Sequence, residues 1–223
     1  MQIGIPSSRS ITTLRVDVDG TDVNSSFSAL SDGRILGVIK GLKNGANVVT
    51  ARGFDNSFGT ARLTITNRPI SGPVLLSAQT TPWICATPST VAASGNTPAS
   101  SASGLTTTAI DAQCNIATEF NLLYRTTTAG CSTALPDPSP PAAAPTNNCF
   151  KPYTMGSAPA DLATTTTTAG LTVPYIVRVE RGTVNRGIYD IVVLFDPAKA
   201  WTPTAPQAQW NRKMVYRFGA STG

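Results

Sequence analysis

The sequence reads Val173-Pro-Tyr-Ile-Val-Arg-Val-Glu180 and, after a short glycine-bounded link, Ile188-Tyr-Asp-Ile-Val-Val-Leu-Phe195. Both runs are rich in β-branched and aromatic residues, and the second is apolar almost throughout. A strand that is apolar on both faces has to be covered on both faces, so these runs predict the interior of a sheet. A third run, Lys213–Phe218, is expected to add a strand and leads into the glycine-rich stretch Gly219–Gly223. Residues 171–223 therefore predict the first strands of a larger sheet whose remainder lies elsewhere.

Composition narrows the class of protein. Only 13% of the 223 residues are charged, while 18 are glycine and 17 are proline. Together with the lack of a sustained helical period, this predicts a mainly β, loop-rich chain of the kind found among secreted or periplasmic proteins. The chain shows no signal-peptide pattern and is expected to be a mature or trimmed form. It has no phosphate-binding or dinucleotide-binding motif, so no cofactor is expected.

Charge and hydropathy argue against two kinds of partner. Lysine and arginine number 17 against 12 acidic residues. The basic residues are scattered along the chain and no aromatic ladder accompanies them, so we expect no nucleic-acid partner. No apolar run reaches about 18 residues, and no membrane span is expected.

Residues 1–66 alternate short apolar runs with turn signals. The runs that predict strands are Thr13–Val18, Arg34–Ile39, Ala46–Ala51 and Thr60–Thr66. Asp-Gly and Asn-Gly pairs precede or follow several of them, which is typical of hairpins in an antiparallel sandwich. Residues 41–51 with 63–66 look like the last hairpin of a bacterial immunoglobulin-like module. We expect such a module over residues 1–66, with a boundary at the Pro- and Gly-containing segment 67–73.

Residues 67–170 hold long Thr, Ala, Ser and Pro tracts and all four cysteines, Cys85, Cys114, Cys131 and Cys149. The spacings contain no Cys-x-x-Cys pair and the chain has no histidine, which argues against zinc. Two disulfides are expected to pin this loop-rich segment to a folded body. Three pairings are possible. Cys85 with Cys114 and Cys131 with Cys149 are favoured because each closes a local loop, and four buried thiols are the alternative. Residues 119–124 have the apolar content of a strand.

Three carboxylates, Asp17, Asp19 and Asp22, are the candidate ligands for a hard cation such as calcium, which takes several oxygen ligands. Their pattern lacks the glycine position and the terminal glutamate of the twelve-residue calcium loop. A hairpin turn at Asp19-Gly20 would account for the same sequence without a metal ion. The turn is the favoured interpretation.

Charged residues gather around the turn between residues 180 and 188. They are Arg178, Glu180, Arg181, Arg186 and Asp190. A salt-bridged rim of the hairpin is the favoured interpretation, because opposite charges facing each other stabilise strand pairs. A contact surface for another part of the protein is the alternative.

The glycine-rich stretch supplies the oxyanion-loop candidates Gly219, Ala220 and Ser221. A loop of small residues after a buried strand directs backbone N–H groups toward a ligand, as an oxyanion hole requires. The spacing of these residues is equally consistent with a glycine-rich segment that has no role in catalysis.

Histidine is absent from the chain. A Ser-His-Asp arrangement therefore cannot be assembled from these residues, and no G-x-S-x-G elbow is present. We expect no catalytic residue in this chain and no hydrolysis by that route from the isolated polypeptide.

Several motifs together resemble a known family. They are the run 173–189, Leu194-Phe-Asp-Pro197, Trp210-Asn-Arg-Lys213, Val215-Tyr-Arg-Phe-Gly219, Pro82-Trp-Ile-Cys85 and Val16–Asp22. The chain resembles the N-terminal portion of a secreted bacterial family of largely unassigned function, whose full-length members resemble tannase and feruloyl-esterase type α/β-hydrolases. The resemblance implies an α/β-hydrolase-like sheet, and a Gly-x-Cys-Ser-Gly-Gly type nucleophile segment with its acid and base downstream of Gly223. It also implies an ester or amide substrate, small or polymeric, and a partner that is the C-terminal catalytic part of the same protein or a second chain.

Two functions fit the sequence. In the first, the chain is the N-terminal chain or fragment of a secreted hydrolase and supplies scaffold, lid loops and a possible oxyanion loop. In the second, it is a non-enzymatic extracellular binding or surface-structural β protein. If residues 215–218 end at an open sheet edge, or pair with another chain, the first function is favoured, and a closed sandwich without an open edge favours the second.

Overall fold

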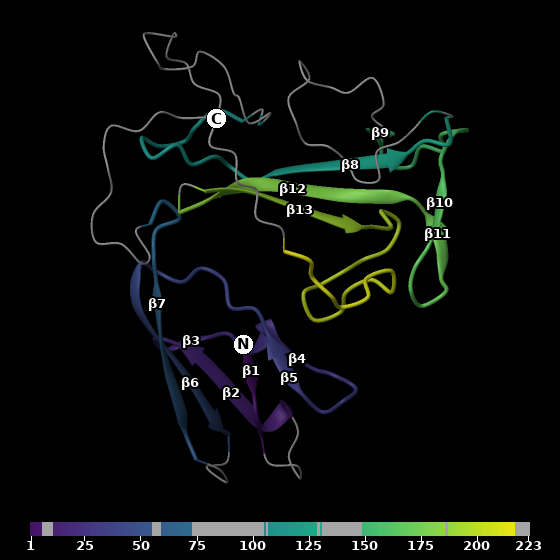
Figure 1. The fold of residues 1–223 in the computed structure, drawn as a ribbon. Coiled ribbons are helices and arrows are strands. Elements are labelled where there is room, and N and C mark those ends of the chain that lie inside the picture. The colour runs from purple at the N-terminus through teal and green to yellow at the C-terminus, as the bar shows by residue number, and fades with distance from the viewer. Residues whose placement is uncertain are drawn as a thin grey trace. The chain divides into compact units, whose positions relative to one another are not determined.

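The computed structural model describes residues 1–5, 11–54, 59–72, 105, 107–128, 130, 149–185 and 187–216 (Figure 1). These residues form thirteen strands and two short 3-10 helices, so the predicted mainly β class is confirmed. The chain divides into two units. The first comprises Met1–Gln79 and Trp201–Pro206, and the second comprises Thr80–Ala200 and Gln207–Gly223. Among the described residues, no helix is long and apolar enough to cross a membrane.

The first unit contains two antiparallel sheets. Its elements are β1 (Gln2–Ile3), η1 (Ile11–Thr13), β2 (Leu14–Val18), β3 (Thr21–Asp22), η2 (Asn24–Ser26), β4 (Phe27–Ala29), β5 (Ile35–Gly37), β6 (Gly45–Gly53) and β7 (Ala61–Asn67). The strand orders are β1-β5-β4 and β3-β2-β6-β7. The predicted strands at residues 13–18, 34–39, 46–51 and 60–66 are thereby confirmed to within a few residues.

One hydrophobic core is shared by the two sheets of this unit. Ile3, Phe27 and Ile35 come from the three-stranded sheet, and Leu14, Val16 and Val49 come from the four-stranded sheet. Their alternation along short strands places them on one face of each sheet, because side chains of a strand point to opposite faces in turn. The antiparallel arrangement is confirmed, and the immunoglobulin-like topology stays a prediction.

The turn between β2 and β3 has the geometry that its sequence predicts. Asp19 has φ +49° and Gly20 has φ +86°. Val18 pairs with Thr21 across them. Two consecutive residues with positive φ define a two-residue hairpin turn of the primed type, which Asp-Gly favours.

The second unit contains a four-stranded antiparallel sheet and a small hairpin. Its strands are β8 (Glu119–Arg125), β9 (Phe150–Pro152), β10 (Thr164–Thr166), β11 (Thr172–Pro174), β12 (Ile176–Val184) and β13 (Gly187–Leu194). The sheet has the order β13-β12-β8-β9, and β10 pairs with β11 (Figure 1). The predicted strand at 119–124 is confirmed, and it lies beside β12 in the centre of the sheet.

Three expectations for this unit are wrong. The run 173–180 is split at Tyr175, because residues 172–174 pair with β10 while β12 begins at Ile176. Thr164–Thr166 form a strand instead of a loop, since β11 supplies a pairing partner. The described part of the third predicted strand, residues 213–216, has no strand, and its Met214 and Val215 side chains are 84% and 93% exposed.

The described residues do not supply the cover expected on both faces of β13. β13 is the last strand of its sheet, and Ile188, Ile191 and Val192 are exposed. Its sequence is apolar enough for a buried strand, but among the described residues nothing packs over most of it. The first two strands of the last fifty residues thus form the confirmed hairpin β12–β13, which joins β8 from the segment predicted to be loop-rich.

Candidate functional site

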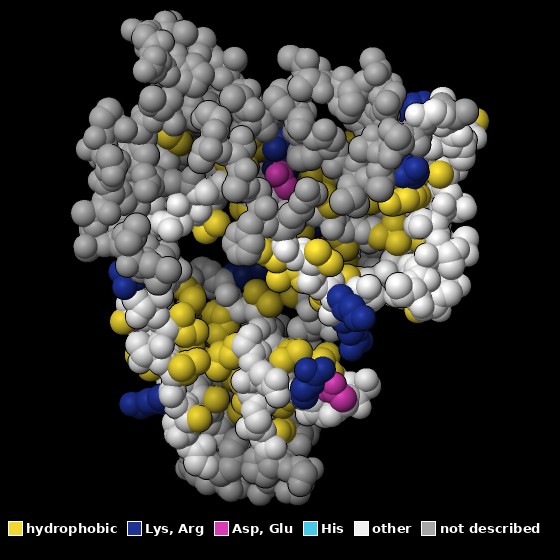
Figure 2. Space-filling view, in the orientation of Figure 1, with side chains coloured by type: hydrophobic (Ala, Val, Ile, Leu, Met, Phe, Trp, Pro, Cys, Tyr) yellow, Lys and Arg dark blue, Asp and Glu magenta, His cyan; other side chains and the backbone are white. Residues whose placement is uncertain are grey.

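The sheet of the second unit carries its core cluster on one face and two exposed apolar side chains on the other. Val177 and Val179 of β12 are 3% and 4% exposed and form a core with Cys149 and Phe150. The register places Phe120 of β8 opposite Glu180 of β12, and Glu180 opposite Ile191 of β13. Phe120 and Ile191, on the face away from this core, are 56% and 53% exposed. Apolar side chains also reach the surface in the space-filling view (Figure 2).

We call this surface the Phe120 face. Its members lie on the face opposite the core cluster, on three neighbouring strands. They are Phe120 and Leu122 of β8, Arg178 and Glu180 of β12, and Ile191 and Val193 of β13. A large exposed patch of apolar side chains on a sheet is typical of a surface that contacts other protein.

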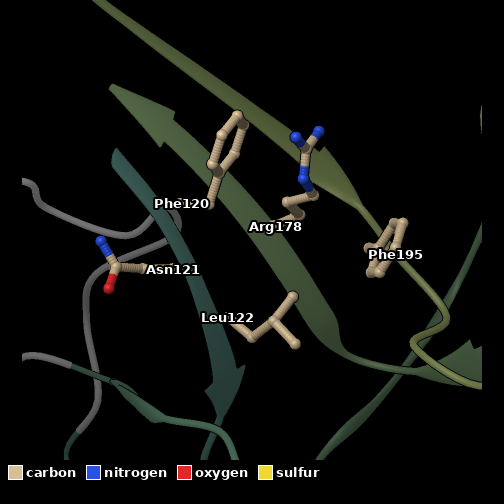
Figure 3. A pocket seen from close by; sticks show the side chains of 5 residues that line it. All are labelled: Phe120, Asn121, Leu122, Arg178 and Phe195. Carbon is tan, nitrogen blue, oxygen red and sulfur yellow. The ribbon is translucent and has the colours of Figure 1, made fainter. Parts of the chain in front are cut away.

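A shallow hollow lies on the Phe120 face, with a volume of about 170 Å³. Phe120, Asn121, Leu122, Arg178 and Phe195 line it. In Figure 3, Phe120, Leu122 and Arg178 project to one side of the sheet, while Asn121 points away from them. Its volume is below the roughly 300 Å³ at which small-molecule sites begin. The five lining residues supply one cation and aromatic surface, and none of them is an ordinary nucleophile or general base.

Arg178 is the charged centre of this face. Its guanidinium carbon lies 4.4 Å from the centroid of the Phe120 ring, and its Nη2 lies 3.3 Å from Oε2 of Glu180. The Tyr189 hydroxyl donates a hydrogen bond to the other Glu180 oxygen at 3.2 Å. Tyr189 lies over Gly182, where a Cβ would come within 2.7 Å of its hydroxyl oxygen. The glycine therefore leaves the space that brings Tyr189 to Glu180.

On the buried face, Arg181 pairs with Asp190. Arg181 is 6% exposed, and its Nε donates a hydrogen bond to Oδ1 of Asp190 on β13. On β8, the other neighbour of β12, the residue opposite Arg181 is Glu119. The Glu119 carboxylate accepts a hydrogen bond from the backbone N–H of Thr107 at 2.6 Å. The salt-bridged rim is therefore confirmed for the Arg178–Glu180 and Arg181–Asp190 pairs, and Arg186 lies outside the described residues.

The three candidate metal ligands near the first hairpin bind different partners. Asp17 accepts a hydrogen bond from the Gly20 N–H at 3.1 Å. Asp19 forms an ion pair with Lys43 at 2.8 Å, and Asp22 accepts a hydrogen bond from the Asn24 N–H at 2.9 Å. No group of three His, Cys, Asp or Glu side chains in the described part of the chain is placed to hold a metal ion. These carboxylates serve the turn and the strands beside it.

Other predicted site residues lie outside the described residues. Gly219, Ala220 and Ser221 are among them, so the oxyanion loop stays a prediction. Each favoured disulfide includes one such residue, Cys85 or Cys131, and both pairings stay predictions. The described Cys149 is fully buried in the core beside β12.

A polar cluster around Asp161 was missed by the sequence-based prediction. Asp161 accepts hydrogen bonds from the Tyr124 hydroxyl at 2.9 Å, the Thr126 hydroxyl at 2.6 Å and Nζ of Lys151 at 2.6 Å. The donors come from the end of β8 and from β9, so Asp161 ties the segment after β9 to the sheet. No spacing in the sequence reveals it, because the three donors lie far from Asp161 along the chain.

The same hydrogen bonds change the titration of this cluster. The bonds from Lys151, Thr126 and Tyr124 hold the pKa of Asp161 well below its ordinary value of 3.8. Burial, together with the bond to Asp161, raises the pKa of the Tyr124 hydroxyl. A carboxylate whose pKa is lowered on folding stabilises the folded state above its unfolded pKa, and this stabilisation is lost as the pH falls.

We expect Asp161→Asn to flatten the acid side of the stability profile. The wild-type chain should lose stability as the pH falls from about 5 toward 2, and the variant should lose less because it lacks the ionised carboxylate. The measurement is the urea unfolding midpoint as a function of pH. Lys151→Met removes the hydrogen bond that contributes most to the lowered pKa of Asp161. Its stability should therefore fall less steeply with decreasing pH than that of the wild type, though more steeply than that of Asp161→Asn. An Asp161→Asn profile that parallels the wild type would contradict this role.

Fold and site together define a class: a two-unit, mainly β scaffold with an uncovered sheet face and no histidine. A sequence family matches residues 1–223, the tannase-like family of unknown function DUF6351. The chain belongs to this family, which confirms the resemblance drawn from its motifs. No curated protein and no solved structure matches the chain.

Proposed function

We propose that this chain is the non-catalytic scaffold portion of a secreted or periplasmic hydrolase that acts on an ester or amide. The downstream catalytic part, in the same protein or in a second chain, would supply the nucleophile, its acid and its base. The observation that carries the proposal is the uncovered Phe120 face. Membership in a tannase-like family supports the hydrolase class, and the absence of histidine supports a division of labour between two parts.

The exposed apolar side chains of the Phe120 face would be stabilised by another part of the protein packing on them. Phe120 near the start of β8 and Ile191 in the middle of β13 expose more than half of their side chains, and β12 lies between their two strands. Exposed apolar area of this kind is stabilised when other protein packs on it, by about 25 cal/mol per Å² buried. Because an antiparallel sheet can leave one face to solvent, it is the exposed Phe120 and Ile191 side chains, rather than the sheet type, that favour this face as the place where the catalytic part would pack.

The proposal also assigns roles to the first unit, to the loops of residues 67–170 and to the glycine-rich stretch. The first unit would act as an immunoglobulin-like module, the disulfide-pinned loops would shape a lid, and Gly219 to Ser221 would donate N–H groups to an oxyanion. Phe120 and Arg178 would meet an apolar surface that also carries an acceptor for the guanidinium.

The test compares the chain alone with a longer polypeptide that joins it to its downstream part. The isolated chain should not hydrolyse an aryl ester such as p-nitrophenyl acetate above buffer, and the longer polypeptide should. In the longer polypeptide, Phe120→Asp should lower kcat/KM by more than about tenfold, because it places a charge in the apolar contact.

Ile110→Asp is the matched control, since Ile110 is equally exposed but lies in the loop before β8. Activity of the isolated chain, or equal activity of both aspartate variants, would overturn the proposal. An extracellular binding protein, the alternative, would show no hydrolysis in either form.

A further inference from the structure

The outer edge of β13 is a second surface, which borders the Phe120 face at Ile191 and Val193. β13 is the terminal strand in the order β13-β12-β8-β9. The Phe195 N–H donates to the Ile176 carbonyl at 2.9 Å, and the register continues from this pair to Leu194 with Val177. Hydrogen-bonded and non-hydrogen-bonded pairs alternate along antiparallel strands. The residues at 187, 189, 191 and 193 therefore direct their backbone groups toward β12, and Ile188, Asp190, Val192 and Leu194 direct theirs outward.

These outward groups have no protein partner within the described part of the chain. No backbone hydrogen bond links the N–H or C=O of these four residues to another described residue. Ile188, Ile191 and Val192 each expose 40% or more of their side chains beside that edge. As far as the described residues extend, the edge is thus long, apolar and without a strand beside it.

Natural proteins usually protect such an edge, and this one lacks the usual devices. Lysine, proline and short length are the common means of preventing strand pairing. β13 spans eight residues and contains neither lysine nor proline. Its one charged residue, Asp190, forms an ion pair with the buried Arg181 of β12, so its charge is balanced within the sheet.

The sequence of this edge complements itself. When two copies of β13 run antiparallel about a two-fold axis at Ile191, Ile188 stands opposite Leu194 of the other copy, and Asp190 stands opposite Val192. Every outward residue then has an outward residue opposite it. A shift of the axis to Asp190 would place the two Asp190 carboxylates opposite each other, which is destabilising. A shift to Val192 would leave Ile188 unpaired.

We propose that β13 is a self-association edge that pairs with β13 of a second copy of this chain, antiparallel and centred on Ile191. Two four-stranded sheets would then form one continuous sheet, and the exposed Ile188, Ile191 and Val192 side chains would stand beside Leu194, Ile191 and Asp190 of the partner. Of the Phe120 face this pairing would touch only the β13 margin at Ile191 and Val193 and would leave Phe120 and Arg178 free for a covering element, so it does not depend on the proposed hydrolase function.

Two adjacent proline substitutions separate pairing between copies from folding of the sheet. The Val192 N–H points outward, and proline is tolerated on an edge strand where the N–H faces away from the ladder. Val192→Pro should keep the far-UV circular dichroism of the chain and raise the dissociation constant of the dimer by at least about tenfold in sedimentation equilibrium. Val193→Pro removes an N–H that binds β12 and should instead lower the unfolding temperature.

A cysteine pair tests the register and does not depend on the proline variants. Residues directly opposite at a non-hydrogen-bonded position have Cα atoms about 4.5 Å apart, within the range of a disulfide. Ile191→Cys, at the axis, should form a covalent dimer on mild oxidation. Val193→Cys would lie about 13 Å from its own copy and should not. Both variants retain the native cysteines, so any background crosslinking is common to them.

A wild-type chain that remains a monomer at about 100 µM would overturn the proposal. It would equally be overturned by a dimer that Val192→Pro leaves intact, or by equal crosslinking of the two cysteine variants. A longer polypeptide in which one of its own strands protects the Val192 amide from hydrogen exchange, without dimerisation, would show a different occupant of this edge and would also overturn it.

Discussion

Replacing Arg181 with alanine is expected to destabilise the second unit by about 3 kcal/mol. Arg181 is buried, hydrogen-bonds to Asp190 of β13 and stands opposite the buried Glu119 of β8. Its removal leaves Glu119 of β8 buried without the cation opposite it, which is costly, and it also leaves the more exposed Asp190 of β13 without its partner. The measurement is native-state hydrogen exchange at amides of β8 and β12.

Arg178→Ala is the matched control for this prediction. Arg178 lies three residues earlier on the same strand, on the opposite and less covered face. Its pair with Glu180 is partly solvent-exposed, so its loss should cost about 1 kcal/mol or less. Equal losses for the two variants would mean that burial of Arg181 does not decide its contribution.

Phe150→Ala is the second substitution with a large expected effect, about 3 to 5 kcal/mol. Phe150 is buried in the core with Val177 and Val179, and its ring packs edge-on against Tyr175 with centroids 5.5 Å apart. Truncation removes this apolar contact and leaves a cavity between β9 and β12. Urea unfolding followed by circular dichroism would report it as a shift of the transition that belongs to the second unit.

The control is Phe120→Ala on the uncovered face of the same sheet. Phe120 is mostly exposed, so its truncation should cost less than about 1 kcal/mol in the isolated chain. A loss below 1 kcal/mol for Phe150→Ala would contradict the packing of residues 149–152 against β12. That segment was predicted to be a pinned loop, so the comparison also tests whether it belongs to the core.

Local patterns predicted much of the secondary structure. Asp19-Gly20 formed the expected turn because two residues with positive φ favour glycine and tolerate aspartate. The alternating run Thr13–Val18 became β2, and Glu119–Tyr124 became β8. In each case the determining interactions lie within a few residues, so the sequence carries the information directly.

Predictions that depended on distant partners were less successful. The apolar run 188–195 was expected to be covered by protein that lies elsewhere, and in the described residues β13 is an exposed edge, because an apolar sequence shows that a strand favours cover but not which residues supply it. Thr164–Thr166 were assigned to a loop on composition, although β11 lies in register to pair with them. Residues 213–216 have strand-forming side chains but no strand beside them.

The candidate site was predictable only in part. The charged residues around the β12–β13 hairpin were identified from sequence, and their pairing was the favoured interpretation. The stacking of Arg178 on Phe120 was not foreseen, because it depends on β8 lying next to β12 across more than fifty residues of intervening chain. The Asp161 cluster could not be recognised in the sequence either, because its hydrogen-bond donors belong to β8, to the residue after it and to β9.

By itself, the sequence determined that the chain is mainly β, that it belongs to a tannase-like family, and that it contains no histidine for a Ser-His-Asp arrangement. Only the tertiary structure decided which strands are neighbours, and therefore that one face and one edge of the second sheet remain open. The physical reason is the range of the interactions. Turn and strand preferences act between adjacent residues, whereas strand order and burial depend on contacts between residues far apart in the chain.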